Sequence, residues 1–422
     1  MAFRRRKLSP VPAYLVLSGG HALFSTVALS FNLVFQTQEA GLNPFQLVLV
    51  GTALQGTIFL CEVPTGVLAD VYSRKRSVVI GLCLLGLGLM MNGALARFET
   101  ILLAQLVWGT GHTFISGARQ AWIADEIGTE RAAKVYLRAT QAEQLSWLVA
   151  IPIATVLANR DLNLPIILGG ACLIGLGAFL ALAMSEDGFQ RPQRHDGSAA
   201  WRSFGETLGA STRLVRHSPL LITVFCITAF YGMASQGFDR LWVAHFLRNI
   251  DFPETANPVI WFGVIRMGSA ILTIAGVEFV RRRVDTASHA VVARGLFLIN
   301  FFQIVSVFFL AAASAFLVGV IAFWIAIALS FMYDPLYLAW INQNIESRVR
   351  ATVISMTSQT DAIGRIAGGP VLGAIGSVVT LRAAMVGTGL SLVPALLLYT
   401  RAFRQGRPQT RPEPESGPAQ GA

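Results

Sequence analysis

Charged side chains are scarce in this sequence: Asp, Glu, Lys and Arg together make up 13% of its 422 residues. A soluble globular domain carries about 25% of them, and a soluble chain of this length would normally fold as two or three domains. Hydrophobic residues make up 54%, and the mean hydropathy is +0.58, so there is too little polar side chain to cover several soluble globules. The composition therefore excludes a soluble protein and predicts a membrane protein with many spans.

Cysteines and the sequence signatures of catalysis are also scarce. The four cysteines each lie inside an apolar run and share no ligand spacing, so we expect neither a disulfide framework nor a metal site. The ATP-binding motif G-x-x-x-x-G-K-[ST] does not occur. A membrane transferase would need a cluster such as D-D-x-x-D or paired His and Asp residues, and Asp125-Glu126 alone is a weak sign of one. We therefore expect a protein that is not an enzyme and holds no bound cofactor.

Apolar runs long enough to cross a bilayer recur along the whole chain. A membrane-spanning helix needs about 20 mostly apolar residues. Twelve runs meet this requirement: 14–35, 46–69, 78–96, 101–123, 135–157, 164–184, 220–245, 259–280, 290–312, 316–341, 352–379 and 383–399. The first run follows a basic segment, as a signal peptide does, but it is too long for one and eleven further spans follow. The sequence predicts an all-α polytopic membrane protein.

The basic residues indicate how these spans are oriented. The net charge is +10, but Lys and Arg lie in short clusters between the apolar runs, which is typical of cytoplasmic anchors rather than of a nucleic-acid-binding face. With the N-terminus inside, 25 Lys and Arg residues fall in the inner segments, whereas the outer segments hold four: Arg97, Arg160, Arg248 and Arg382. The positive-inside rule therefore places both termini in the cytoplasm.

The longest connection follows the sixth span and divides the twelve spans into two sets of six. The predicted organisation is a cytoplasmic N-terminus (1–13), a first six-helix bundle (14–184), a cytoplasmic linker (185–218), a second six-helix bundle (219–401) and a disordered cytoplasmic tail (402–422). Within the linker, residues 201–217 have the pattern of a basic amphipathic helix on the inner membrane surface. The tail is rich in Pro, Gly, Gln and Glu.

The two halves of the sequence contain similar runs, and in both halves every third span lacks charged residues in its interior. The run 66–76 follows the second span, and a similar run at 276–283 follows the eighth. The third, sixth, ninth and twelfth spans have no charged residue in their interiors, whereas charged residues occur in the other spans. A charge in hydrocarbon costs about 3 kcal/mol or more, so such groups face a partner or a wet cavity. This distribution predicts eight helices around a polar pathway and four at the periphery.

The run 66–76 resembles the signature of the major facilitator superfamily, G-x-L-A-D-x-x-G-R-K/R-x, which lies between the second and third helices. Ser73 replaces the second glycine, and the matching residues are Gly66, Leu68, Ala69, Asp70, Arg74 and Lys75. With twelve spans divided six and six, the resemblance covers nearly the whole chain. It implies two six-helix bundles that transport a small molecule by alternating access. Residues 62–66 and 350–355 also resemble bacterial drug-efflux members.

The signature indicates a conformational latch at the cytoplasmic side, formed by Gly66, Asp70, Arg74 and Arg119. Asp70 lies at the end of the second helix, where it could accept hydrogen bonds from Arg119 or from the facing N-terminus of the eleventh helix. Breaking and remaking this contact would shift the balance between inward-open and outward-open states. The alternative is that the basic residues at 74–76 only anchor the chain at the membrane surface.

Two departures from proton-coupled drug exporters concern the fourth and fifth helices. Those exporters usually have an R-x-x-Q-G pattern in the fourth helix. At the aligned positions this chain has Gln105 in place of the arginine and Trp108 in place of the glutamine. Their fifth-helix motif G-x-x-x-G-P-x-x-G-G is also missing. A related pattern appears instead in the eleventh span, which corresponds to the fifth under the family's pseudo-two-fold, and we expect it to allow close helix packing through Gly364, Gly368, Gly369, Pro370 and Gly373.

The resemblance implies a central cavity lined by the first, fourth, seventh and tenth helices. Carboxyl and imidazole groups inside spans are candidates for carrying protons: Glu62, Asp239, Asp334 and His112. Aromatic and polar side chains are candidates for the substrate cavity: His21, Gln105, Trp108, Tyr231, Gln236, Arg266 and Tyr333. Each has an ordinary structural alternative, such as a neutral histidine bonded to a neighbouring helix, a structural ion pair or an aromatic belt at the interface.

These observations predict a secondary transporter in the inner or plasma membrane of a bacterium. We expect a monomer that exports a small organic or drug-like compound in exchange for protons, so the energy source is the proton gradient and not a bound cofactor. The bilayer and a small molecule are its expected partners, and nucleic acid is not. An importer or uniporter of a specific metabolite is the main alternative, because the sequence does not encode direction. A membrane enzyme or a sensor that does not transport explains the charges within the spans poorly.

Overall fold

The computed structural model describes residues 7–189, 219–286, 288–345 and 347–405, and the regular elements of this part of the chain are α-helices. The predicted linker lies mostly at 190–218, so the amphipathic stretch within it falls outside the described residues, as do residues 1–6 of the predicted N-terminal segment and 406–422 of the predicted tail. Helix α16 extends to Gln405, a few residues past the predicted start of the tail.

The first half of the chain folds into a bundle of six spans. Its second, third, fifth and sixth spans are single helices, and its first and fourth are each divided in two. The helices are α1 (Pro10–Leu29), α2 (Asn32–Gln38), α3 (Pro44–Val71), α4 (Arg74–Ala94), α5 (Phe98–Ser116), α6 (Ala118–Ile127), α7 (Thr129–Ala158) and α8 (Leu164–Ala183).

The second half repeats this arrangement, with a division in its last span. Its helices are α10 (Pro219–Asn249), α11 (Pro258–Arg283), α12 (His289–Ala312), α13 (Phe316–Asn344), α14 (Ser347–Val378), α15 (Leu381–Ser391) and α16 (Val393–Gln405). All twelve predicted spans are therefore present as helices. Among the described residues, nine helices are long and apolar enough to cross a membrane by composition alone. The spans built from α5, α7 and α14 fall short, and they carry many of the polar side chains discussed below.

Two helices of the first bundle, α3 and α4, begin with side-chain caps. At α3, the Asn43 side chain accepts a hydrogen bond from the Gln46 backbone N–H, the Gln46 side chain accepts one from the Asn43 backbone N–H, and Pro44 occupies the first turn. Such a capping box satisfies backbone N–H groups that have no partner within the helix. At α4, the Ser73 hydroxyl accepts from the Arg76 N–H. Ser73, which replaces the signature glycine, therefore serves as the N-cap of α4.

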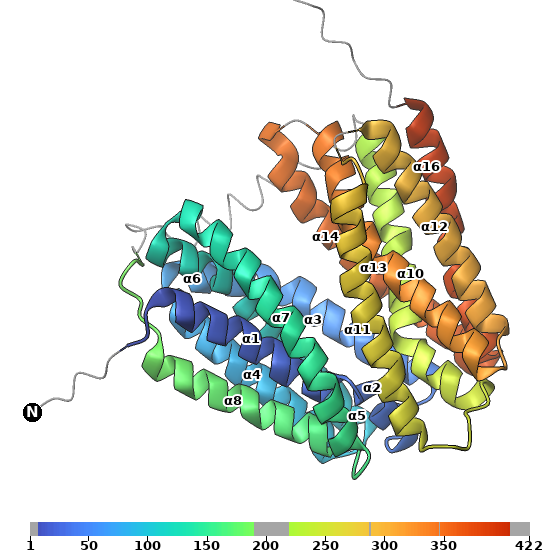
Figure 1. The fold of residues 1–422 in the computed structure, drawn as a ribbon, viewed down its shortest axis with the longest axis horizontal. Helices are drawn as coiled ribbons and strands as arrows, with labels where there is room; N and C mark the ends of the chain where they lie inside the picture. Colours follow the sequence, from blue (N-terminus) through green and yellow to red (C-terminus); the bar gives the residue numbers. More distant parts are fainter. Residues whose placement is uncertain (1–6, 190–218, 287, 346, 406–422) are drawn as a thin grey trace, which may run out of the picture.

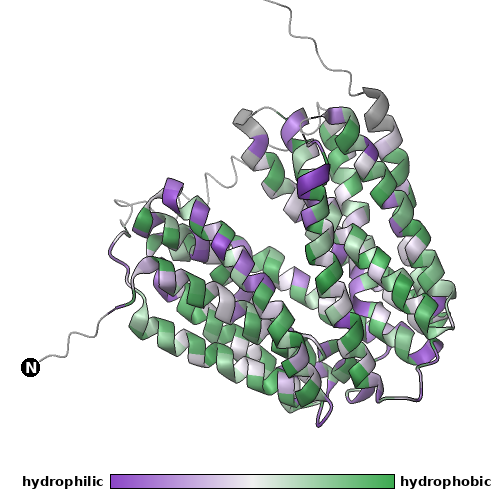
Figure 2. Ribbon diagram, viewed as in Figure 1, coloured by the Kyte–Doolittle hydropathy of each residue, from purple (hydrophilic) through white to green (hydrophobic). Residues whose placement is uncertain are grey.

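The two bundles lie side by side, meet at one end and diverge toward the other (Figure 1). The main contacts between them join α3 to α14, α7 to α11 and α10 to both α2 and α3. The helices α4, α8, α12, α15 and α16 take no part in these main contacts, which fits the predicted peripheral position of the third, sixth, ninth and twelfth spans. Hydrophobic residues predominate along the helices of both bundles (Figure 2), and many large apolar side chains are exposed, as a lipid-facing surface requires.

The bundles touch at the ends that we predict to be extracellular. There the Phe45 N–H donates to the Ser377 hydroxyl at 2.8 Å, joining the start of α3 to the end of α14. Further along the same pair of helices, the Gln359 amide donates to Glu62 at 3.2 Å. Beyond that point the bundles spread apart toward the predicted cytoplasmic ends (Figure 1). Given the predicted orientation, the structure has an inward-facing arrangement.

Candidate functional site

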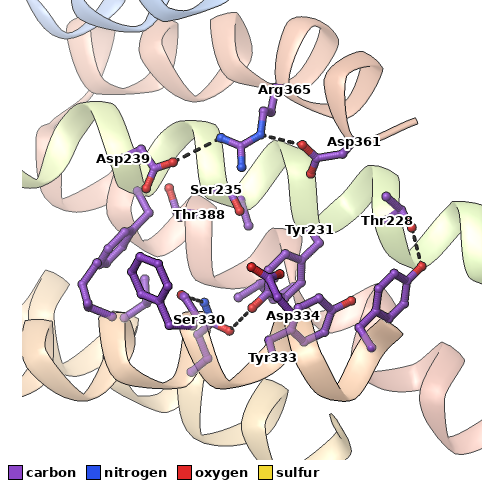
Figure 3. A pocket seen from close by; sticks show the side chains of 18 of the residues that line it. Thr228, Tyr231, Ser235, Asp239, Ser330, Tyr333, Asp334, Asp361, Arg365 and Thr388 are labelled. Atoms are coloured by element: carbon purple, nitrogen blue, oxygen red, sulfur yellow. Dashed lines mark hydrogen bonds and ion pairs between the residues drawn. The ribbon is translucent and has the colours of Figure 1, made fainter. Parts of the chain in front are cut away.

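The main cavity lies within the second bundle and has a volume of about 480 Å³. Its walls come from α10, α12, α13, α14, α15 and the break between α15 and α16. Polar and aromatic side chains dominate this lining (Figure 3), and they include four of the predicted site residues: Tyr231, Asp239, Tyr333 and Asp334. The structure therefore brings together residues that the sequence places a hundred positions apart.

Three acidic residues and one basic residue line this cavity. Arg365 donates to Asp361 at 2.8 Å, as their four-residue spacing on one helix predicts, and to Asp239 of α10 at 3.1 Å. These two carboxylates share one guanidinium (Figure 3). Among the described residues, Asp334 has no hydrogen-bond or ion-pair partner, and its side chain is exposed. With all three acids ionised, the lining carries a net charge of −2.

Stacked tyrosines form one wall of the cavity beside Asp334. The rings of Tyr231 and Tyr333 are 4.0 Å apart and nearly parallel, and Tyr337 stacks on Tyr333 at 5.1 Å. Their hydroxyl groups are all engaged: Tyr231 donates to Gln303 at 2.6 Å, Tyr333 shares a hydrogen bond with Tyr399 and Tyr337 with Thr228. These bonds fix the ring positions, so this wall offers ring faces and edges rather than free hydroxyl groups.

A second, smaller cavity of about 150 Å³ lies in the first bundle. Amide side chains line it, and a hydrogen bond of 2.7 Å from Asn92 to Asn32 joins α4 to α2. The predicted residues Gln105 and Trp108 lie in this lining, next to Arg240, which reaches across from the second bundle. Gln105 and Trp108 are thus separate from the acidic cavity. Trp108 also stacks on His112 with ring centroids 5.6 Å apart.

The latch residues form ion pairs within the first bundle. Asp70 lies 3.5 Å from Arg74, which also pairs with Asp125 of α6 and donates to the Ala121 carbonyl at 2.8 Å. Burial raises the pKa of Asp125, and the Arg74 guanidinium opposes that shift. In this arrangement Asp70 belongs to a network that ties the ends of α3, α4 and α6 together.

Arg119 does not pair with Asp70 as the sequence suggested. It donates to Glu143 of α7 at 3.0 Å, and both side chains are largely buried. Arg119 lies at the start of α6, just past the break at Gly117, and from there it faces the inner half of α7. Among the described residues, Asp70 also has no hydrogen bond or ion pair to α14, and the bundles are apart on this side (Figure 1).

Two of the other predicted residues join the bundles. Gln236 donates to the Val48 carbonyl of α3 at 3.4 Å, and Glu62 accepts from Gln359. The Arg266 guanidinium lies 5.4 Å above the Trp242 ring, which is a cation–π contact. His21 is half-buried on α1.

The glycines of α14 pack against two different partners. A side chain at Gly364 would collide with the Ala229 carbonyl of α10, and one at Gly368 with Met233 of the same helix. A Cβ at Gly369 would lie 2.6 Å from Gln236 of α10 and 3.1 Å from Val48 of α3, and one at Gly373 would lie 3.0 Å from Val48. Gly364 and Gly368 thus let α14 approach α10 within its bundle, Gly373 lets it approach α3 of the other bundle, and Gly369 takes part in both contacts. Pro370 lies inside α14 between these contacts.

The predicted site residues do not include Arg240 or the amide cluster around it. Arg240 follows Asp239 directly, and the angle of about 100° between successive helical residues turns the two side chains apart, but the sequence does not show which cavity each one lines. Asn32 and Gln36 are four residues apart on α2, and the Gln36 amide donates to Asn32 at 3.3 Å and to Asn92 at 3.4 Å. The spacing of these two amides, one helical turn apart inside an apolar span, was the sequence feature that could have indicated this cluster. Among the described residues, no group of His, Cys, Asp or Glu is placed to hold a metal ion.

Twelve spans in two similar bundles, whose third, sixth, ninth and twelfth members have no charged residue in their interiors, define a multi-pass membrane protein. The family model of the Major Facilitator Superfamily matches residues 15–369, and the chain belongs to this family. Its members are transporters and not enzymes. The chain is 22% identical over 363 residues to YxaM of Bacillus subtilis (strain 168), an uncharacterized MFS-type transporter, with 84% of this chain and 86% of that one covered.

Solved structures confirm the fold. The nucleoside transporter NupG is similar with a TM-score of 0.76 and 13% identity, covering 95% of this chain and all of the other. A bacterial homologue of the human lysosomal transporter Spinster, solved in an inward-facing and unoccupied conformation, has a TM-score of 0.73 and 16% identity over 94% of this chain and 96% of its own. At these identities the likeness concerns the fold alone. The protein is a multi-pass membrane transporter whose substrate is a small molecule.

Proposed function

We propose that this transporter exports organic cations in exchange for protons and that Asp334 is the group for which the two compete. The observation that carries this proposal is the composition of the main cavity, where three carboxylates face one guanidinium and Asp334 has no partner among the described residues. Arg365 is already shared by the other two acids. A cationic ligand is the species that such a lining stabilises best.

The aromatic wall favours cations that also carry apolar surface. The stacked rings of Tyr231, Tyr333 and Tyr337 lie beside Asp334 in the lining. A ring face attracts a cation and offers apolar area at the same time, and each such contact contributes about 0.5–2 kcal/mol. A cavity of about 480 Å³ also lies within the range of pockets that hold drug-sized molecules. An amine or quaternary ammonium compound with an aromatic body fits these features.

Competition between a proton and the cationic substrate for Asp334 couples export to proton uptake. A carboxylate that holds a proton is neutral and loses its attraction for a cation, so proton and cation binding exclude each other. Gln105 stands where proton-coupled exporters have an arginine in the fourth span, and the proton site is therefore assigned to the second bundle. Because the bundles diverge toward the predicted cytoplasmic ends, a compound from the cytoplasm can reach the cavity in this state.

The proposal is tested by the accumulation of a lipophilic cation such as tetraphenylphosphonium in bacteria that lack their main exporters. Cells that express the protein should accumulate less of the cation, and a protonophore should abolish the difference. Asp334→Asn should abolish export, whereas Asp251→Asn, which removes an acid from the outer loop after α10, should leave it intact.

Three outcomes would overturn the proposal. Higher accumulation in expressing cells would indicate an importer. Export that persists in Asp334→Asn would assign the proton to another group. Export of neutral analogues at the same rate as the cation would exclude selection by charge.

A further inference from the structure

Arg240 reaches out of its own bundle into the first one. It lies on α10, and its side chain lines the smaller cavity together with residues of α1, α2, α3, α4 and α5. The approach depends on Gly51 of α3, because any side chain there would collide with the Arg240 guanidinium. A cation from the second bundle is thus held inside the first bundle, at the end where the two bundles meet.

This guanidinium has no hydrogen-bond or ion-pair partner among the described residues. Asp239 is its neighbour in sequence and attracts it through space, but successive residues on a helix point about 100° apart. The Asp239 carboxylate forms its hydrogen bond with Arg365 in the other cavity. The described lining of the smaller cavity contains no acid. The positive charge of Arg240 is therefore not matched by an acid in the cavity that it enters.

The lining offers further hydrogen-bond donors next to this charge. Gln105 has an amide group, and the Asn92 amide donates one of its two hydrogens to Asn32 and keeps the other. The indole N–H of Trp108 is buried without a partner among the described residues. A charge in a low-dielectric interior needs an opposite charge, and a buried donor without an acceptor costs about 1–3 kcal/mol. An anion held between Arg240 and these donors would satisfy both requirements.

We infer that the smaller cavity is a binding site for a small monovalent anion, for which chloride is the natural occupant. The volume of about 150 Å³ admits a halide with a water molecule and excludes a drug-sized anion. The site takes its charge from one bundle and its amide donors from the other. Bound chloride would therefore hold the predicted extracellular ends together and stabilise the inward-facing state. This inference does not depend on the substrate or on proton coupling.

The test is the thermal unfolding of the purified protein at constant ionic strength while chloride replaces gluconate, an anion too large for the cavity. The midpoint of unfolding should rise with chloride concentration and reach a plateau, because a ligand that binds only the folded state stabilises it. Arg240→Gln should abolish this rise. Arg266→Gln is the matched control, since Arg266 is a second buried arginine on the neighbouring helix and does not line the cavity; it should keep the rise.

A second variant covers the case in which Arg240→Gln does not fold. Trp108→Phe keeps an aromatic ring but removes the indole N–H, and it should weaken the apparent chloride affinity by about tenfold. Crystals grown with bromide should also show its anomalous signal beside Arg240. A wild-type midpoint that does not respond to chloride would overturn the inference. So would a response that Arg240→Gln and Trp108→Phe leave unchanged, or one that Arg266→Gln removes equally.

Discussion

Arg365 organises the charges of the main cavity. It bonds to one acid on its own helix and to another on α10, and 21% of its side chain is exposed. Removing the shared cation leaves two carboxylates close together in a partly buried site. The cost of breaking such an arrangement is larger than that of an exposed pair, because the remaining charges lose their compensation.

We expect Arg365→Gln to lower the free energy of unfolding by about 1–3 kcal/mol. The double variant Asp361→Asn/Arg365→Gln should recover part of this loss, because it removes one of the two uncompensated charges. Denaturant unfolding of the purified protein measures both. Arg248→Gln, at the exposed end of α10, is the control and should have little effect. A double variant that is as unstable as the single one would contradict this account.

The sequence predicted only the local part of these residue contacts. The pair of Asp361 and Arg365 follows from a four-residue spacing on one helix. Asp239 joins them across two helices, and Arg119 bonds to Glu143 rather than to Asp70. Such contacts depend on how two helices are rotated toward each other, and a spacing in the sequence does not contain that information.

Helix breaks are the main feature of the elements that the sequence analysis did not anticipate. The first span divides at Ser30, whose hydroxyl donates to the Thr26 carbonyl at 2.6 Å, a bond that competes with the helix ladder. The fourth divides at Gly117. The twelfth divides at Leu392, just before Pro394, which has no N–H to continue the ladder. The twelve spans could be predicted because length and hydropathy determine a span. A helix break depends on only one or two residues, which do not change the hydropathy of the run.

The packing of α14 against α10 gives a prediction at the same scale. Gly364→Ala places a methyl group against the Ala229 carbonyl, and a backbone atom cannot move aside as a flexible side chain can. We expect a loss of about 2 kcal/mol or more in stability, since overpacking of this kind forces backbone shifts. Thermal unfolding in detergent measures it. Gly175→Ala on α8 is the matched control, because no other atom lies near that position. Equal midpoints of thermal unfolding for the two variants would contradict the close packing of Gly364 against α10.

The whole molecule divides its polar groups unequally between its two similar halves. The second bundle holds the acidic cavity with its tyrosine wall, and the first holds the amide cavity. Composition and the distribution of basic residues were enough to predict two six-helix bundles and their orientation. They could not predict which conformation is observed, because two states of one transporter differ by only a few kcal/mol and bury much the same residues.

The isolated position of Asp334 has a consequence for the energetics of transport. One carboxylate accepts either one proton or one monovalent cation, so the proposed exchange moves one positive charge in each direction and no net charge. The membrane potential, worth about 2.3 kcal/mol per charge at 100 mV, would then contribute nothing. In proteoliposomes, a pH gradient should drive uptake of a monovalent cation. Valinomycin with potassium, which changes the membrane potential, should not affect this uptake, whereas nigericin, which collapses the pH gradient, should abolish it. A divalent cation on the same carrier should generate a current, and its transport should respond to voltage.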